Sequence, residues 1–349
     1  MNYIGVDLHK NYSFITRMDE KGENIKQMRV ENDPLSLGHF LDTVSPDDKL
    51  ALEATWNWYY FYEMVEDRNL SLSLAHPKNT KAIASAKIIT DKISSTTLAH
   101  LLRANLLPTA YIPTRQVRDT REILRYRASL VAIRSMIKNK VHALLSKNGV
   151  HPHFSDIFGQ KGLNYLKNIK LRPCYRQPLN GYLKIVEVLT QTISEVTKTI
   201  EELVNKNPQA TLLITMPGIS YYSALLILME IGEIDRFPSD KQLCSYGGLV
   251  PSVHSSGGKT RMGSITKEGS KWLRWILIEL SGHAAKGSIK FNRLYQRVSR
   301  KYGKPTARVA VAREMLRVIY HMLKNNEPFR VVPVPKQKSS SHLHGVMSR

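Results

Sequence analysis

"YIGVDLHK", residues 3–10, predicts a buried strand because apolar residues dominate it. Asp7 is a carboxylate inside this apolar run, and Glu53 has the same kind of position in "KLALEAT", residues 49–55. A buried carboxylate is costly unless a cation or a hydrogen-bond donor accompanies it. We therefore expect these two strands to build a polar site within a sheet.

The residues around these strands predict an α/β domain over residues 1–112. Asp33 followed by Pro34 is typical of a helix N-terminus, and "EKGE", residues 20–23, is typical of a turn. Three strands, a helix, a strand, a helix and another strand follow one another, which favours an α/β sheet. The strands are expected over 3–10, 13–20, 24–31, 49–55 and 70–76, and the helices over 33–44 and 56–70.

Residues 113–205 have a helical and basic sequence pattern, unlike the alternating strands and helices before them. Apolar side chains recur at helical spacing through residues 120–145, and cations occupy much of the remaining surface, which predicts a long amphipathic helix with a basic flank. A second helical stretch, residues 182–204, is expected to pair with it as an antiparallel coiled-coil-like arm. The basic flank has two interpretations, a nucleic-acid contact or an ordinary solvated helix face.

The charge of the whole chain favours a polyanionic partner. Its 349 residues include 51 Lys and Arg against 29 Asp and Glu, a net charge of +22. Nucleic acid is the commonest such partner, and no long apolar run or amphipathic anchor favours a membrane. Cys174 and Cys244 form no zinc-ligand pattern, and the opening residues indicate a strand and not a signal peptide. We therefore expect a cytoplasmic protein of at least two domains.

The C-terminal part predicts a mainly helical domain over residues 206–328. A Pro-Gly turn joins two apolar helical runs in residues 212–234, and further amphipathic helices are expected over 270–285 and 306–324. The tail, residues 329–349, lacks periodicity and is expected to be disordered. "HSSGGKTRMGSITKEG", residues 254–269, presents serines, glycines and cations with few apolar residues, which suits either a surface loop or a contact with a polyanion.

A third carboxylate, Asp91, opens the helical run "DKISSTTLAHLLRA", residues 91–104. Together with Asp7 and Glu53 it offers oxygen ligands of the kind that Mg²⁺ prefers. Two such ions stabilise both oxygens of an in-line phosphoryl displacement. The alternative is that Asp7 is a strand-end turn residue and Asp91 a helix cap.

These residues, with "TDKIS" (90–94) and "YGGLVPSVHSSGGKTRMGSITKEGSKWLRW" (246–275), resemble the insertion-sequence family numbered one hundred and ten. Its members are transposases related to the Piv invertase and act as bridge-RNA-guided recombinases. The resemblance extends from residue 1 to about residue 325. It implies a RuvC-like domain of the RNase H fold over 1–112, a helical dimerisation and RNA-binding arm over 113–205, and a C-terminal serine domain.

The resemblance also implies which residues act. Ser256 matches the serine that attacks the scissile phosphodiester, with Ser255 as the alternative, while Asp7, Glu53 and Asp91 match the acidic residues that hold Mg²⁺. Ser94 stands where family members usually carry a fourth carboxylate, which points to a natural weakened site, an engineered inactive variant, or a site that needs only three carboxylates. The cations expected to hold nucleic acid are Arg118, Arg121, Arg125, Arg134, Lys138, Lys259, Arg261, Lys267, Lys271 and Arg274.

The expected function is therefore RNA-guided DNA transposition through a covalent phosphoserine intermediate. The serine domain of one subunit would meet the carboxylate domain of another in a homo-oligomer, a dimer or tetramer, that holds donor DNA, target DNA and guide RNA. A RuvC-like nuclease that uses water and no serine is one alternative, and a nucleic-acid-binding protein with a decayed site is another. His9, His254 and His283 are interpreted as ordinary surface or core residues.

Overall fold

The computed structural model describes residues 1–84, 90–256 and 258–330. The chain divides into two compact units, Met1–Pro113 and Thr114–Arg349. Of the tail expected to be disordered, residues 331–349 lie outside the described residues. Phe329, at its start, is ordered: its ring stacks on Phe291 with the ring centres 5.9 Å apart.

The first unit contains a five-stranded mixed sheet in the order β3-β2-β1-β4-β5. β1 pairs antiparallel with β2 and parallel with β4, β2 pairs antiparallel with β3, and β4 pairs parallel with β5. The predicted α/β sheet is thereby confirmed, and its strands follow one another along the chain as the sequence indicated. The strands are β1 (Tyr3–Leu8), β2 (Tyr12–Met18), β3 (Lys26–Glu31), β4 (Lys49–Glu53) and β5 (Ser71–Ala75).

The described residues of this unit also form the helices α1 (Pro34–Leu41), α2 (Trp58–Glu66), α3 (Pro77–Ile83) and α4 (Asp91–Arg103). The side chain of Asp33 accepts hydrogen bonds from two backbone amides at the start of α1, as its N-cap position predicted. Ile4, Val6 and Leu8 belong to the main core of this unit. Because side chains alternate along a strand, Gly5 and Asp7 face the other side of β1, where α4 packs.

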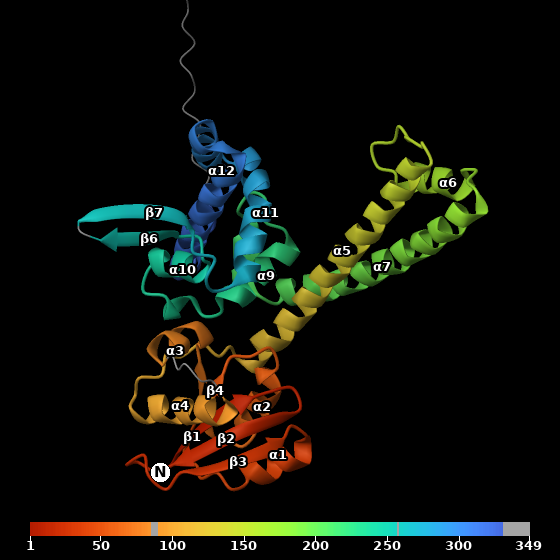
Figure 1. The fold of residues 1–349 in the computed structure, drawn as a ribbon. Helices are drawn as coiled ribbons and strands as arrows, with labels where there is room; N and C mark the ends of the chain where they lie inside the picture. Colours follow the sequence, from red (N-terminus) through yellow and green to blue (C-terminus); the bar gives the residue numbers. More distant parts are fainter. Residues whose placement is uncertain (85–89, 257, 331–349) are drawn as a thin grey trace, which may run out of the picture. The chain divides into compact units, whose positions relative to one another are not determined.

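The second unit begins with two long helices that lie side by side, α5 (Arg115–Lys147) and α7 (Pro173–Asn205). The short helix α6 (Gln160–Asn168) lies in the connection between them, at the far end of the pair (Figure 1). Both long helices were predicted from the spacing of apolar residues. At the C-terminal end of α5, the two long helices and α6 pack around a small hydrophobic core that includes Leu144, Leu166 and Leu179. The hairpin therefore has an apolar seam of its own.

The rest of the second unit is mostly helical around one large core. Its helices are α8 (Pro208–Ile214), α9 (Tyr221–Ile231), the 3-10 helix η1 (Ile234–Arg236), α10 (Asp240–Tyr246), α11 (Lys271–Gly287) and α12 (Ile289–Asn325). α12 is interrupted at Gly303, whose φ of 84° lies in the left-handed region. A two-stranded antiparallel hairpin, β6 (Pro251–Ser256) and β7 (Lys259–Ile265), precedes α11, where no strands were predicted from the sequence.

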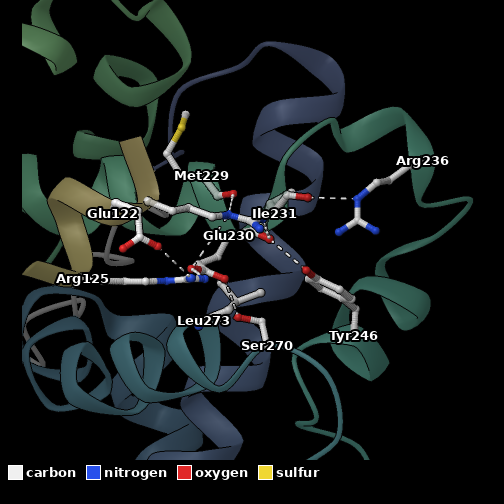
Figure 2. Close-up of polar contacts among 10 residues, drawn as sticks. Glu122, Arg125, Met229, Glu230, Ile231, Arg236, Tyr246, Ser270 and Leu273 are labelled. Atoms are coloured by element: carbon white, nitrogen blue, oxygen red, sulfur yellow. Dashed lines mark hydrogen bonds and ion pairs between the residues drawn. The ribbon is translucent and has the colours of Figure 1, made fainter. Parts of the chain in front are cut away.

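A buried carboxylate, Glu230 of α9, links the N-terminal part of α5 to the helical core through polar contacts (Figure 2). Its Oε1 lies 2.8 Å from Arg125 Nη2, and its Oε2 accepts a hydrogen bond of 2.8 Å from the Ser270 hydroxyl. Arg121 donates hydrogen bonds to the carbonyl oxygens of Met229 and Glu230. Arg125 and the Ser270 hydroxyl together satisfy a carboxylate that is only 3% exposed, and Arg121 Nε lies 4.0 Å from the same group.

The two cysteines differ in their surroundings. Cys174 is exposed near the start of α7, whereas Cys244 is buried in α10. Burial raises the pKa of the Cys244 thiol to about 11. Within the described residues, no helix combines the length and apolar character needed to cross a bilayer.

Candidate active site: a carboxylate and histidine cluster

Asp7 and Glu53 occupy neighbouring positions on adjacent parallel strands. Val6 of β1 pairs with Leu52 of β4, and the two carboxylates directly follow that pair. Leu50 and Leu52 point into the main core, so Glu53 faces the same side of the sheet as Asp7. Strand alternation and register together place both acidic groups beneath α4.

Gly5 allows α4 to come close to the sheet. A Cβ at Gly5 would collide with the carbonyl oxygen of Ser95, so only glycine fits at this crossing. Next to it, the hydroxyls of Thr16 and Ser95 form a buried hydrogen bond of 2.7 Å. The close approach brings the first turn of α4, with Asp91 and Ser94, over the end of β1.

The result is a compact cluster of ligand-type atoms. The potential ligand atoms of Asp7, His9 and Asp91 all lie within 4.8 Å of one another. His9 Nε2 lies 3.5 Å from Asp7 Oδ2 and 3.3 Å from Asp91 Oδ1. The Tyr12 hydroxyl donates a hydrogen bond of 2.9 Å to Asp91 Oδ2. Asp91 is therefore held in place from a second side.

The electrostatics of the cluster favour a bound cation. Burial raises the pKa of Asp7, and the charge of Asp91 raises it further, while His9 and a hydrogen bond from Ser94 lower it. Burial also raises the pKa of Glu53, with the charge of Asp7 as the second cause. Carboxylates that burial and mutual repulsion discourage from ionising are stabilised when a positive ion lies between them. The donor set of oxygens and one imidazole thus suits a divalent metal ion.

A cavity of about 510 Å³ borders the cluster. Glu53 and Ser94 line it together with two cations of α3, Lys78 and Lys81. Ser94, which the sequence placed at the fourth acidic position, therefore lies within the site and contacts both Asp7 and the cavity. A cavity lined by acidic, hydroxyl and basic groups suits a phosphate-bearing chain.

Ser256 lies elsewhere, in the second unit, as the last residue of β6. It is exposed and pairs with Lys259 across the end of the hairpin. The Ser255 hydroxyl is 3.4 Å from that of Thr260 on β7. Each unit thus carries a different part of the expected site, the acidic residues in one and the serine in the other.

The cations expected to bind nucleic acid fall into distinct groups. Arg118 and Arg121 are buried, and Arg121 and Arg125 are engaged with α9 as described above. Arg274 donates hydrogen bonds to the carbonyl oxygens of Gly247 and Glu268. These four side chains thus take part in the packing of the second unit.

The remaining cations are partly or fully exposed wherever their side chains are described. Arg134 and Lys138 line a second cavity, about 760 Å³, between α5 and α7, and Lys167 and Lys184 line it as well. Near the β6–β7 hairpin the exposed cations are Arg261, Lys267 and Lys271. For Lys259 the side chain lies outside the described part of the chain.

Sequence reasoning set His9 aside and did not consider Tyr12. Asp7 and His9 are two residues apart at the end of a strand, a spacing that puts side chains on one face, so the signal was present. Tyr12 reaches Asp91 only because β2 folds back beside β1, and Arg29 on β3 lies over its ring, 4.1 Å from the ring centre. No local pattern announces that contact.

Two family models match the chain. A transposase model of the IS110 type with a DEDD domain matches residues 4–149, and the model for the IS116/IS110/IS902 transposase family matches residues 210–297. The first contains the carboxylate cluster and the second contains the β6–β7 hairpin. Together they span well over half of the chain.

Similar proteins include other transposases. The transposase for insertion sequence element IS1111A of Coxiella burnetii is 23% identical over 336 residues, covering 94% of this chain and 91% of that protein. The transposase for IS1328 of Yersinia enterocolitica is 23% identical, covering 79% of this chain and 81% of that protein. The pilin gene-inverting protein of Moraxella bovis is 32% identical over 148 residues, 40% of this chain and 46% of that protein. The chain belongs to the IS110/IS116 family of insertion-sequence transposases.

Proposed function

We propose that this transposase cuts and rejoins DNA with a divalent cation held by Asp7, Glu53 and Asp91 and with Ser256 as the nucleophile. The observation that carries the proposal is that Asp7 and Glu53 lie side by side on one face of the sheet and that Asp91, at the start of α4, comes close to Asp7. When bound, Mg²⁺ or a similar ion supplies Lewis-acid polarisation of the scissile phosphate. Ser94 contributes a hydrogen bond to Asp7 and no charge.

Ser256 has the exposure that an attacking group needs. Its Oγ forms a bond to the phosphorus, its proton passes to water, and the bond from phosphorus to the leaving deoxyribose oxygen breaks, releasing that strand end as a hydroxyl. Rejoining is the reverse attack by a hydroxyl of the new DNA end, which frees the serine. The energy of the phosphodiester is conserved in the phosphoserine, so no external energy source is required.

The acidic cluster and Ser256 belong to different units, and we propose that they meet across subunits of a homo-oligomer. The exposed cations beside Ser256 would then hold phosphates that flank the attacked one. Arg134 and Lys138 on the α5–α7 hairpin provide a basic surface for a guide RNA, whose pairing with donor and target DNA selects the sequence.

The test is detection of a covalent protein–DNA adduct. The full chain, purified with its co-purifying RNA, is incubated with labelled donor and target DNA and Mg²⁺ or Mn²⁺, then denatured in detergent. A slow-migrating labelled protein is expected, lost in Ser256→Ala and kept in Ser255→Ala. An adduct lost only in Ser255→Ala would move the nucleophile by one residue, and strand cutting that survives both changes would favour a water-using nuclease.

A further inference from the structure

We propose that His9 is a nitrogen ligand of the divalent ion and that the site consequently prefers a first-row transition ion, such as Mn²⁺, to Mg²⁺. This inference rests on the proposed carboxylate metal site and adds a ligand and a selectivity to it. It starts from the position of one atom, His9 Nε2, between the carboxylates of Asp7 and Asp91.

That atom is buried and lacks a hydrogen-bond partner among the described residues, although the His9 side chain as a whole is 38% exposed. It lies 3.3 Å from Asp91 Oδ1 and 3.5 Å from Asp7 Oδ2, within ion-pair distance of both carboxylates. A nitrogen that approaches two carboxylates without a well-aligned hydrogen bond to either is poorly satisfied in the protein alone. A cation shared by all three groups satisfies it.

The imidazole is also fixed in orientation. Its ring packs on the Tyr12 ring with the centres 4.9 Å apart, and the Arg29 guanidinium covers Tyr12 at 4.1 Å from its ring centre. Tyr12 at the same time donates its hydroxyl proton to Asp91. One tyrosine therefore positions two of the proposed ligands, which is the usual role of groups hydrogen-bonded to metal ligands.

The chemistry of the ligand set gives the selectivity. Mg²⁺ favours an all-oxygen octahedron with retained waters, whereas an imidazole nitrogen strengthens the binding of transition ions. Ser94, where a carboxylate would give Mg²⁺ another anionic oxygen, shifts the balance further in the same direction. Asp7, His9 and Asp91 thus form a mixed nitrogen and oxygen site.

The experiment measures binding without DNA. Mn²⁺ is titrated into the full-length protein and followed by electron paramagnetic resonance, Mg²⁺ affinity is obtained by competition, and electron spin echo modulation detects ¹⁴N coupled to bound Mn²⁺. The variants are His9→Ala, Asp7→Asn and, as a matched control, His39→Ala, an exposed histidine on α1. Circular dichroism confirms that each variant is folded.

We expect His9→Ala to weaken Mn²⁺ binding by about tenfold or more, to change Mg²⁺ affinity much less, and to abolish the ¹⁴N modulation, with His39→Ala unchanged. Persistence of the ¹⁴N modulation or of the Mn²⁺ affinity in His9→Ala overturns the inference. The experiment distinguishes a failure of the histidine ligand from a failure of the carboxylate metal site. If Asp7→Asn weakens Mn²⁺ binding and His9→Ala does not, only the proposed histidine ligand is wrong. Unchanged Mn²⁺ binding in Asp7→Asn contradicts the carboxylate site itself.

Discussion

The backbone of α4 crosses β1 at Gly5, where the carbonyl oxygen of Ser95 occupies the space that any side chain would need. This crossing sets the height of α4 above the sheet, and with it the distance of Asp91 and Ser94 from Asp7. The carboxylate and histidine cluster therefore depends on a residue that contributes none of its polar groups.

Gly5→Ala is expected to push α4 away from the sheet. Overpacking of this kind costs about 1–3 kcal/mol, and the displaced Asp91 should weaken Mn²⁺ binding as well. Urea denaturation and the Mn²⁺ titration measure the two effects. Gly181→Ala in α7 is the control, because a Cβ there meets nothing within 4 Å and alanine favours a helix. Full Mn²⁺ affinity in Gly5→Ala would contradict this account.

Ser94→Asp should restore charge to the site at a cost to the metal-free protein. A carboxylate beside Asp7 adds repulsion that lowers the melting temperature in a chelator, while Mg²⁺ should raise that temperature more than it does in the wild type. Mg²⁺-dependent strand cleavage should increase in parallel. Cleavage that stays the same after Ser94→Asp would mean that three carboxylates already suffice.

The raised pKa values of Asp7 and Glu53 predict a pH dependence of the metal-free protein. A folded state that binds the proton more tightly than the unfolded chain loses stability as pH rises from the ordinary carboxyl pKa through the raised one. Asp7→Asn removes part of this loss, so its melting temperature in chelator should rise relative to that of the wild type as the pH increases above about 4.

Asp19, Asp33 and Asp240 have lowered pKa values, so their contribution to stability increases as the pH rises. The effect of Asp7 is therefore read from the difference between variant and wild type at each pH. Saturating Mn²⁺ should reverse the ranking, since the cation stabilises ionised Asp7. If the melting temperatures of Asp7→Asn and the wild type in chelator differ by the same amount at every pH, then ionisation of Asp7 does not destabilise the metal-free protein.

Glu230→Gln should destabilise the second unit strongly. Removing one partner of a buried ion pair costs about 3–5 kcal/mol, and here Arg125 and the Ser270 hydroxyl both lose a charged acceptor. The control is Glu122→Gln, whose carboxylate is exposed and lies 3.9 Å from Arg125, so its effect should stay within about 1 kcal/mol. Thermal and urea unfolding of the two variants would be compared directly.

Arg134→Ala combined with Lys138→Ala should weaken RNA binding and reduce its dependence on salt. Each phosphate contact that is lost lowers the slope of log affinity against log salt by about 1. Lys26→Ala on β3 is the control for a simple loss of charge. An unchanged slope in the double variant would exclude the α5–α7 hairpin as the RNA surface.

Part of this picture could be predicted from the sequence because the signal is local. Apolar runs bounded by turns gave the strands, and a carboxylate within such a run marked Asp7 and Glu53. The N-cap at Asp33 and the start of α4 at Asp91 also follow from neighbouring residues.

The rest depends on contacts between distant segments. Arg121 is buried, and carbonyl oxygens of α9, more than 100 residues away, accept its hydrogen bonds, which its place on a basic helix does not reveal. The β6–β7 hairpin has strands too polar to show apolar alternation. His9 can be recognised as part of the site only in the folded structure, where α4 places Asp91 next to it.

The contrast between the two thiols has a practical consequence. Cys174 is exposed near the start of α7, while Cys244 is buried and its pKa is raised to about 11, which leaves almost no reactive thiolate at neutral pH. A maleimide spin label should therefore attach at a single place without any engineered change. Pulsed dipolar spectra of the labelled assembly would then report label-to-label separations on the α5–α7 hairpins, and so how neighbouring copies are arranged on DNA.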